Sequence, residues 1–195
     1  MKAMQYQGYG SPDRLKLSDV PAPRPAPLQL LVRVRATSVN PVDWKLHTGQ
    51  YRLLMPVRFP STPGFDVAGE VVEVGSQVTR FRVGDRIFAM LNARRVRGGA
   101  AAEYALVDES AAAQAPANLS AQEAAAIPLA GLTALQGLRD LGEIAAGQHV
   151  LIVGASGGVG HFAVQIARHY GATVTAVASD RRAAMLRALG ADRVI

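Results

Sequence analysis

One glycine-rich stretch, HVLIVGASGGVG at residues 149–160, has the residue types and the spacing to bind a phosphate group. Its glycines stand at positions 154, 157, 158 and 160, directly after an apolar run. Glycine lets the backbone come close to a phosphate because no Cβ is in the way, and a following helix would direct its free N–H groups and its positive end at that phosphate. The spacing is GxxGxxG rather than GxGxxG, and we favour dinucleotide binding over a tight turn that binds nothing.

A second stretch, SVNPVDWKLHTG at residues 38–49, brings polar and aromatic groups onto one turn. Pro41 suits the first position of a short helix, and Asn40 suits its N-cap. The loop-like segment 51–63 comes next, with three prolines, and a loop of this length in a compact domain is often functional. This region is therefore a second candidate for chemistry.

The elements that must position these groups fall into two parts. Residues 1–117 are mostly short strands joined by Gly and Pro turns, which is typical of a compact β-barrel, and residues 28–36 alternate as a half-buried antiparallel strand. The later part contains strand, glycine turn, helix and strand, the order of one right-handed βαβ unit. We predict two domains, 1–117 and 118–195, the second with a parallel α/β sheet.

Local signals place further elements in the second part. Residues 120–123 form a capping-box pattern that opens a helix, residues 129–141 predict a second helix, and residues 181–189 predict a third. Residues 193–195 begin another strand. A complete doubly wound dinucleotide domain has roughly six strands, so we expect the chain to be a fragment of a longer protein.

The composition excludes several kinds of chemistry. The chain has 195 residues and no cysteine, which excludes disulfides, thiolate zinc sites and a cysteine nucleophile. The net charge of +6 comes mostly from arginine, and the densest cluster of positive charge is Arg94, Arg95 and Arg97. We interpret this cluster as a solvated loop rather than a nucleic-acid binding patch, because no aromatic residues are interleaved with the arginines. No run approaches the roughly 18 apolar residues of a membrane helix. We expect no nucleic-acid or membrane partner and a cytoplasmic location.

Motifs spread over nearly the whole chain resemble the medium-chain dehydrogenase/reductase superfamily, and within it the zinc-free quinone oxidoreductases of the zeta-crystallin type. They are SVNPVDWKLHTGQY at 38–51, PGFDVAGEVVEVG at 63–75, FRVGDRIFA at 81–89, AEYALV at 102–107, GLTAL at 131–135, VLIVGASGGVGHFAVQIAR at 150–168 and LGAD at 189–192. The resemblance implies an α/β plus β fold, in which a GroES-like β-barrel domain is followed by a partial Rossmann domain with a doubly wound parallel sheet.

The resemblance also implies an activity. As in the branch it resembles, the chain is expected to transfer hydride from a nicotinamide cofactor to an electron-poor carbon of a quinone or an α,β-unsaturated carbonyl. An enoyl-thioester or alkenal reductase is the alternative enzyme, and a non-catalytic truncated fragment is the alternative outside enzymes. The implied partners are a small-molecule substrate and a second copy in a homodimer.

The same resemblance predicts that no zinc is bound. Zinc-dependent relatives place a Cys where this chain has Asn40, a His where it has Phe65, and a Cys or its equivalent near Leu129. None of these three residues can replace a thiolate or imidazole ligand. The four histidines show no metal-like spacing, and we assign them no chemistry.

Four residues outside the glycine stretch carry over from the resemblance. Asn40 resembles the asparagine that faces the nicotinamide and the substrate, where its amide could orient a carbonyl; a simple helix cap is the alternative. Tyr51 resembles the tyrosine of the family's SGxY and could place a phenol donor over the substrate; an exposed loop tyrosine is the alternative. Lys45 falls near a proton-relay position of the zinc enzymes, but we favour a solvated lysine. Thr133 resembles the threonine that contacts the nicotinamide carboxamide or ribose.

The resemblance places the cofactor's pyrophosphate on one set of residues, Gly154, Ser156, Gly157, Gly158, Val159 and Gly160. At the end of the second strand, NAD-preferring folds place an acid, whereas NADP binders place small residues and Arg or Lys. Here Ser179 and Arg181, with Arg182 as an alternate, resemble the NADP pattern, while a one-residue shift would make Asp180 the ribose acid. We predict NADPH rather than NADH.

Overall fold

The computed structural model describes residues 1–91 and 98–195. The predicted arginine cluster at Arg94, Arg95 and Arg97 lies outside the described residues. The chain divides into two compact units, Met1–Leu129 (unit 1) and Ala130–Ile195 (unit 2), and each is described by itself. The domain boundary expected after residue 117 stays a prediction. No helix in the described part of the chain is long and apolar enough to cross a membrane.

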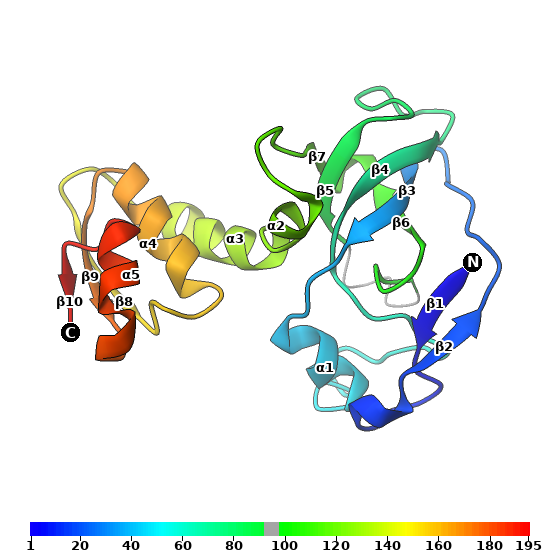
Figure 1. The fold of residues 1–195 in the computed structure, drawn as a ribbon, viewed down its shortest axis with the longest axis horizontal. Helices are drawn as coiled ribbons and strands as arrows, with labels where there is room; N and C mark the ends of the chain where they lie inside the picture. Colours follow the sequence, from blue (N-terminus) through cyan, green and yellow to red (C-terminus); the bar gives the residue numbers. More distant parts are fainter. Residues whose placement is uncertain (92–97) are drawn as a thin grey trace. The chain divides into compact units, whose positions relative to one another are not determined.

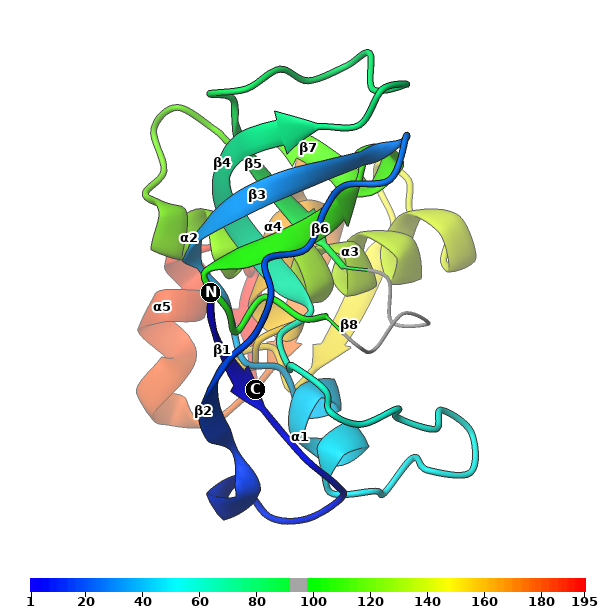
Figure 2. The ribbon, with the colours of Figure 1, turned by 90° about the vertical axis from the view of Figure 1, so that its right-hand side faces the viewer.

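Unit 1 is built on a five-stranded antiparallel sheet with the strand order β6-β3-β4-β5-β7 (Figure 1). Its strands are β3 (Gln29–Ala36), β4 (Asp66–Val74), β5 (Arg86–Met90), β6 (Tyr104–Asp108) and β7 (Ala112–Gln114). A hairpin of β1 (Lys2–Gln5) and β2 (Lys16–Asp19) pairs separately. Figure 2 shows the large sheet curling upon itself. The strand expected at residues 28–36 is confirmed as β3.

The curled sheet encloses the core of unit 1. The buried side chains of that core are Leu30, Val32, Val67, Val71, Phe81, Ile87, Ala89, Leu91, Ala100, Ala105, Val107 and Ala112. The core residues that belong to strands lie on alternate positions, because successive side chains of a strand point to opposite faces; Phe81, Leu91 and Ala100 join the core from the connecting segments. On β3 this places Leu30 and Val32 in the core, while Arg33 and Arg35 are exposed.

Short helices complete unit 1. They are η1 (Pro12–Arg14), α1 (Pro41–His47), η3 (Glu109–Ala111) and α2 (Ala121–Ala125), and α3 (Pro128–Leu135) begins at the end of this unit. The predicted capping box is confirmed at α2: Ser120 Oγ accepts a hydrogen bond from the Glu123 N–H at 3.2 Å, and the Glu123 carboxylate accepts one from the Ser120 N–H at 2.8 Å.

Unit 2 contains a parallel three-stranded sheet with the order β10-β9-β8. Its elements are η4 (Gln136–Leu141), β8 (His149–Val153), α4 (Gly160–His169), β9 (Thr173–Val177), η5 (Asp180–Arg182), α5 (Ala183–Ala188) and β10 (Arg193–Val194). Ala163, Val164 and Ala167 of α4 are buried in one core with Ile152 and Val174, because helical spacing puts them on one face. The predicted βαβ unit and the predicted fold class are confirmed.

The helix expected at residues 129–141 has a less regular form. It is observed as α3 followed by η4, which is π-helical, and the Gly142 N–H donates to the Gly137 carbonyl at 3.0 Å. A π-helical turn contains one residue more than an α-helical turn, so it shifts the side-chain register at the helix end.

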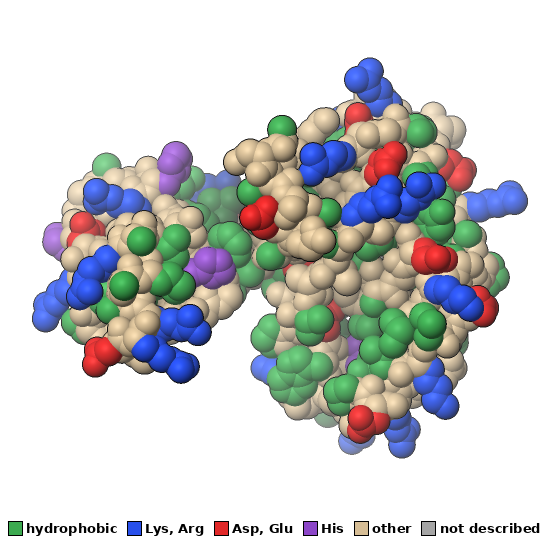
Figure 3. All heavy atoms as spheres, in the orientation of Figure 1, with side chains coloured by type: hydrophobic (Ala, Val, Ile, Leu, Met, Phe, Trp, Pro, Cys, Tyr) green, Lys and Arg blue, Asp and Glu red, His purple; other side chains and the backbone are tan. Residues whose placement is uncertain are grey.

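On the face drawn in Figure 3, Lys and Arg side chains are scattered over each unit rather than gathered in one patch.

Candidate functional site

A buried carboxylate, Asp66 at the start of β4, organises the polar groups of unit 1. Its Oδ2 accepts hydrogen bonds from Asn40 Nδ2 at 2.7 Å and from the Ser38 hydroxyl. Its Oδ1 accepts a hydrogen bond from the Leu129 N–H at 2.8 Å. The sequence pattern did not single out Asp66. The available signal was an acidic residue at the head of a strand whose next residues, Val67 and Ala68, are apolar.

The backbone of Asn40 is held by a second carboxylate. The predicted helix is confirmed as α1, with Asn40 at its N-cap and Pro41 at its first position. The Asn40 N–H donates to Asp43 Oδ2 at 2.7 Å, and the Gly64 N–H donates to Asp43 Oδ1 at 2.9 Å. Burial raises the pKa of Asp43, and these two N–H donors oppose that effect. Asp43 therefore fixes where α1 begins.

His47 lies at the other end of α1 and is fully buried. Its Nδ1 lies 2.7 Å from the Asp43 carbonyl oxygen, and a carbonyl oxygen can only accept a hydrogen bond. Nδ1 therefore carries the proton of the neutral ring. Nε2 then accepts a hydrogen bond from the Ser61 hydroxyl at 3.1 Å. The ring stacks on Tyr6 with a centroid distance of 4.5 Å. Burial lowers the pKa of His47, which favours this neutral form. His47 thus ties α1 to the segment around Ser61.

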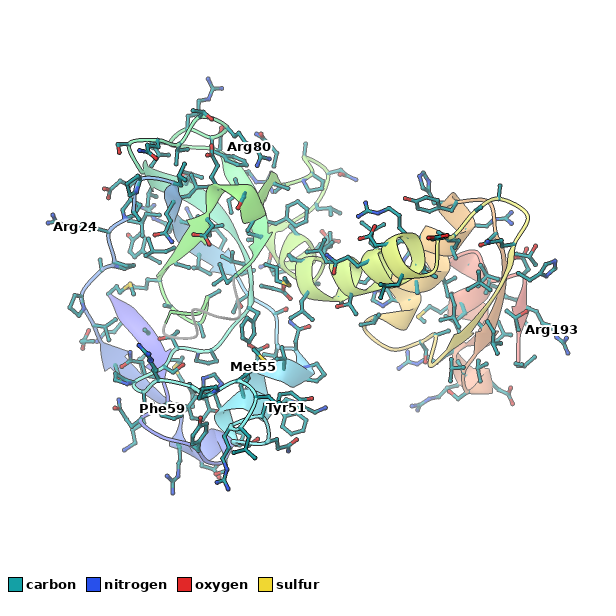
Figure 4. All side chains as sticks on the ribbon, turned by 180° about the vertical axis from the view of Figure 1, so that it is seen from behind. Arg24, Tyr51, Met55, Phe59, Arg80 and Arg193 are labelled. Carbon is teal, nitrogen blue, oxygen red and sulfur yellow. The ribbon has the colours of Figure 1, made fainter. Side chains whose placement is uncertain are left out.

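Tyr51 lies just after α1 and is half-buried. Its ring packs with Met55 and Phe59 against an apolar cluster that contains Leu46 (Figure 4). The Lys45 Nζ lies 5.9 Å from the centre of the Tyr51 ring and 5.6 Å from that of Trp44. At these distances a cation is attracted to each ring face. Lys45 is half-buried beside two aromatic rings, and its role stays a prediction.

The glycine stretch of unit 2 forms the turn between β8 and α4. Gly154 has a φ of +71°, a conformation that residues with a Cβ rarely adopt. A Cβ on Gly160 would lie 2.3 Å from the Gly154 carbonyl oxygen, so the chain itself requires glycine at that position. A Cβ on Gly158, by contrast, would meet no heavy atom of the described chain within 4 Å. Gly158 therefore borders open space, two residues before α4 begins.

The residues expected to read the cofactor's ribose lie after β9. Ser179 caps η5, and its carbonyl accepts a hydrogen bond from the Arg182 N–H at 2.9 Å. Asp180, Arg181 and Arg182 are all exposed, and neither guanidinium forms an ion pair within residues 1–91 and 98–195. Both positive charges are thus available to an anion in solution. Thr133, on α3 in unit 2, is also exposed.

Comparisons with known proteins cover the whole chain. The family described as alcohol dehydrogenase GroES-like domain matches residues 26–117, and the family described as zinc-binding dehydrogenase matches residues 158–195. The chain is 45% identical over 201 residues to a quinone-oxidoreductase homolog, chloroplastic, of Spinacia oleracea, with 100% of this chain and 60% of that protein covered. A quinone oxidoreductase structure from Coxiella burnetii aligns with a TM-score of 0.87 at 39% identity, covering 100% of this chain and 62% of that one. The chain belongs to the medium-chain dehydrogenase/reductase superfamily.

Within this superfamily the relatives are those of the quinone oxidoreductase branch, as the resemblance predicted. The GroES-like and Rossmann-type parts follow in the expected order. The chain is also 40% identical over 202 residues to an NADPH-dependent alkenal/one oxidoreductase, chloroplastic, of Arabidopsis thaliana, with 100% of this chain and 52% of that protein covered. The chain thus spans between about half and three-fifths of the length of these curated relatives.

The superfamily includes zinc-dependent members, and the residues at the zinc positions do not fit that metal here. Phe65 is buried in an apolar cluster against which Leu129 packs, and the Asn40 amide nitrogen donates to Asp66. Zinc needs thiolate, imidazole or carboxylate donors that converge on one point. The described residues contain no group of three or more His, Cys, Asp or Glu side chains that could hold a metal ion.

Proposed function

We propose that this chain carries the cofactor and substrate groups of a zinc-independent, NADPH-dependent oxidoreductase, which transfers hydride to a quinone or an α,β-unsaturated carbonyl. The glycine turn between β8 and α4 is the observation that carries the proposal. Its open space at Gly158 lies before the N-terminus of a ten-residue helix, where backbone N–H groups and the helix dipole favour a phosphate.

The residues present fit a nicotinamide dinucleotide. Gly154, Ser156, Gly157, Gly158, Val159 and Gly160 would hold its pyrophosphate, with Thr133 as a further contact. When bound, this cofactor supplies hydride. Ser179, Arg181 and Arg182 favour NADPH over NADH, because a 2′-phosphate is a dianion that exposed guanidinium groups bind well.

In unit 1, Asn40 and Tyr51 are the proposed groups around the reacting carbonyl. Hydride addition to an electron-poor carbon leaves negative charge on the carbonyl oxygen, and the product needs a proton. The Tyr51 hydroxyl is a donor of the required kind. Tyr51 lies on the loop that follows α1, and its ring packs against the apolar cluster that contains Leu46. No metal ion takes part in this scheme, because Asn40, Phe65 and Leu129 provide no zinc ligand.

An alkenal or enoyl-thioester reductase is the second candidate. The name of the Arabidopsis thaliana relative, an alkenal/one oxidoreductase, supports it. Both candidates use the same hydride transfer and differ in the acceptor that fits the site. We further propose a small-molecule substrate and a homodimer. A cytoplasmic location stays a prediction, since both curated relatives compared here are named chloroplastic.

Titration of the chain with NADPH, followed by nicotinamide fluorescence, tests the proposal. We expect a saturable change with NADPH and a weaker one with NADH. Binding followed by quinone-dependent NADPH oxidation supports the reductase, and binding without turnover supports a cofactor-binding fragment. A chain that does not bind NADPH contradicts both.

A further inference from the structure

The His161 side chain, in the first turn of α4, reaches back to the glycine turn that precedes this helix. Its Nδ1 lies 2.9 Å from the Gly157 carbonyl oxygen. A carbonyl oxygen can only accept a hydrogen bond, so Nδ1 carries a proton and donates it. The backbone N–H of His161 donates to the same oxygen at 3.1 Å. His161 therefore supplies two hydrogen bonds to the Gly157 carbonyl, one from its backbone and one from its ring.

The peptide bond that joins Gly157 to Gly158 has glycine on both sides. Neither glycine has the positive φ that Gly154 has, so neither is required there by the shape of the backbone. A peptide between two glycines rotates with little steric hindrance, because no Cβ stands on either side of it. In a trans peptide the C=O and the N–H point in opposite directions. The direction of the Gly157 carbonyl thus determines where the Gly158 N–H points.

The orientation that His161 holds leaves donors for an anion. With the Gly157 carbonyl turned towards His161, the Gly158 N–H points to the other side of the peptide. Within residues 1–91 and 98–195, the N–H groups of Gly158 and Val159 donate no hydrogen bond, and both residues are exposed. Successive free N–H groups before a helix favour a phosphate. A rotated peptide would present the Gly157 carbonyl oxygen instead, which repels a phosphate.

We propose that His161 is a positioning residue for the pyrophosphate of the cofactor. It holds the Gly157 carbonyl, and so it orients the N–H groups of Gly158 and Val159 before the cofactor binds. This role rests on the proposed function. The His161 ring lies 4.2 Å, between centroids, from that of Phe162, which packs against the core of unit 2. In the neutral ring Nε2 carries no proton, so the imidazole acts through the peptide rather than by donating to the phosphate itself.

The first test needs no cofactor and uses nuclear magnetic resonance on the whole chain at about pH 8, where an ordinary imidazole is neutral. Correlations between ring protons and ring nitrogens identify the protonated nitrogen, which we expect to be Nδ1 of His161. Nitrogen relaxation should show a rigid Gly158 amide. Its order parameter should fall in His161→Leu and return in His161→Asn, whose Nδ2 takes the place of Nδ1. A proton on Nε2, or an unchanged order parameter in His161→Leu, would overturn the proposal.

The second test measures NADPH and NADH affinity for His161→Leu, His161→Asn and Gln165→Leu. Gln165 is the matched control, because its Nε2 donates to the His161 carbonyl at 3.0 Å, a hydrogen bond of the same kind on the same helix. In His161→Leu both cofactors should bind about fivefold more weakly, the effect of one ordinary hydrogen bond, since both contain the pyrophosphate. The other two variants should bind as the unmutated chain does.

Two outcomes of the second test contradict the positioning role. Equal losses in His161→Leu and Gln165→Leu would mean that any weakening of α4 lowers the affinity. Equal losses in His161→Leu and His161→Asn would mean that the imidazole itself contacts the cofactor. If the unmutated chain binds neither cofactor, the proposed function fails, while the first test still decides whether His161 holds the peptide between Gly157 and Gly158.

Discussion

Gly160 and Gly154 pack against each other so closely that a Cβ on Gly160 would lie 2.3 Å from the Gly154 carbonyl oxygen. The obstacle is backbone, which cannot swing aside as a flexible side chain can. We predict that Gly160→Ala lowers the free energy of unfolding by about 3 kcal/mol. Urea unfolding measures this, with Gly137→Ala as control, because a Cβ at Gly137 meets no heavy atom of residues 1–91 and 98–195 within 4 Å. Equal stability of the two variants would contradict the packing.

Gly158 should behave in the opposite way. A Cβ there meets no heavy atom of the described chain within 4 Å, so Gly158→Ala should leave the unfolding curve nearly unchanged. It should nevertheless weaken NADPH binding about tenfold or more, because the methyl group would occupy space needed for close approach of the pyrophosphate. Fluorescence titration of this variant and of Gly137→Ala checks it. If Gly158→Ala binds NADPH as tightly as the unmutated chain, the phosphate does not lie there.

Arg181 and Arg182 should determine the choice between the two cofactors. Removing a charge-assisted contact to the 2′-phosphate should weaken NADPH binding about tenfold per arginine involved and leave NADH binding unchanged. The variants Arg181→Ala and Arg182→Ala are compared with Arg187→Ala, an exposed arginine of α5 that serves as control for net charge. An unchanged ratio of NADPH to NADH affinity in the double variant would show that the NADPH assignment is wrong.

The buried His47 should make the chain less stable as the pH falls. Burial lowers its pKa, so the unfolded chain takes up a proton near the ordinary value of 6.5 while the native chain does not. The free energy of unfolding should therefore decrease from about pH 7 to about pH 5.5. Asp43 acts in the opposite direction, because burial raises its pKa above the ordinary value of 3.8.

The variant His47→Gln isolates this effect. It should be about 1–2 kcal/mol less stable at neutral pH, since the contacts to Asp43 and Ser61 are weakened, and it should lose most of the pH slope. Urea unfolding at a series of pH values, followed by the fluorescence of Trp44, the chain's single tryptophan, gives both quantities. An identical slope in both proteins would mean that His47 is not the titrating group.

The regular parts of the fold could be predicted because their signals are local. Alternation identified β3, and the S-x-x-E pattern identified the capping box at Ser120 and Glu123, whose two hydrogen bonds join residues three positions apart. The strand, turn and helix around Gly154 and Gly160 were likewise evident from one short stretch. By contrast, nothing in residues 136–141 distinguishes a π-helical turn from an α-helix.

The centre of the candidate site could not be predicted in the same way. Asp66 acquires its role from partners 26 and 63 positions away in the sequence, Asn40 and Leu129. A single sequence does not reveal which distant donors will meet a buried carboxylate. The sequence did identify Asn40 itself, as helix cap and as candidate site residue. It did not reveal that the Asn40 side-chain nitrogen donates a hydrogen bond to Asp66 within unit 1.

Acceptor-dependent oxidation of NADPH, after treatment of the protein with a metal chelator, tests the central claim most directly. The nicotinamide absorbance is followed with a quinone, and separately with an α,β-unsaturated ketone, as acceptor. We predict that NADPH is consumed only when an acceptor is present, that the rate with NADH is lower, and that the chelator has no effect on the rate. Loss of activity on chelation with recovery on added zinc would contradict the zinc-independent mechanism, and absence of turnover with both acceptors would contradict the reductase activity of this chain.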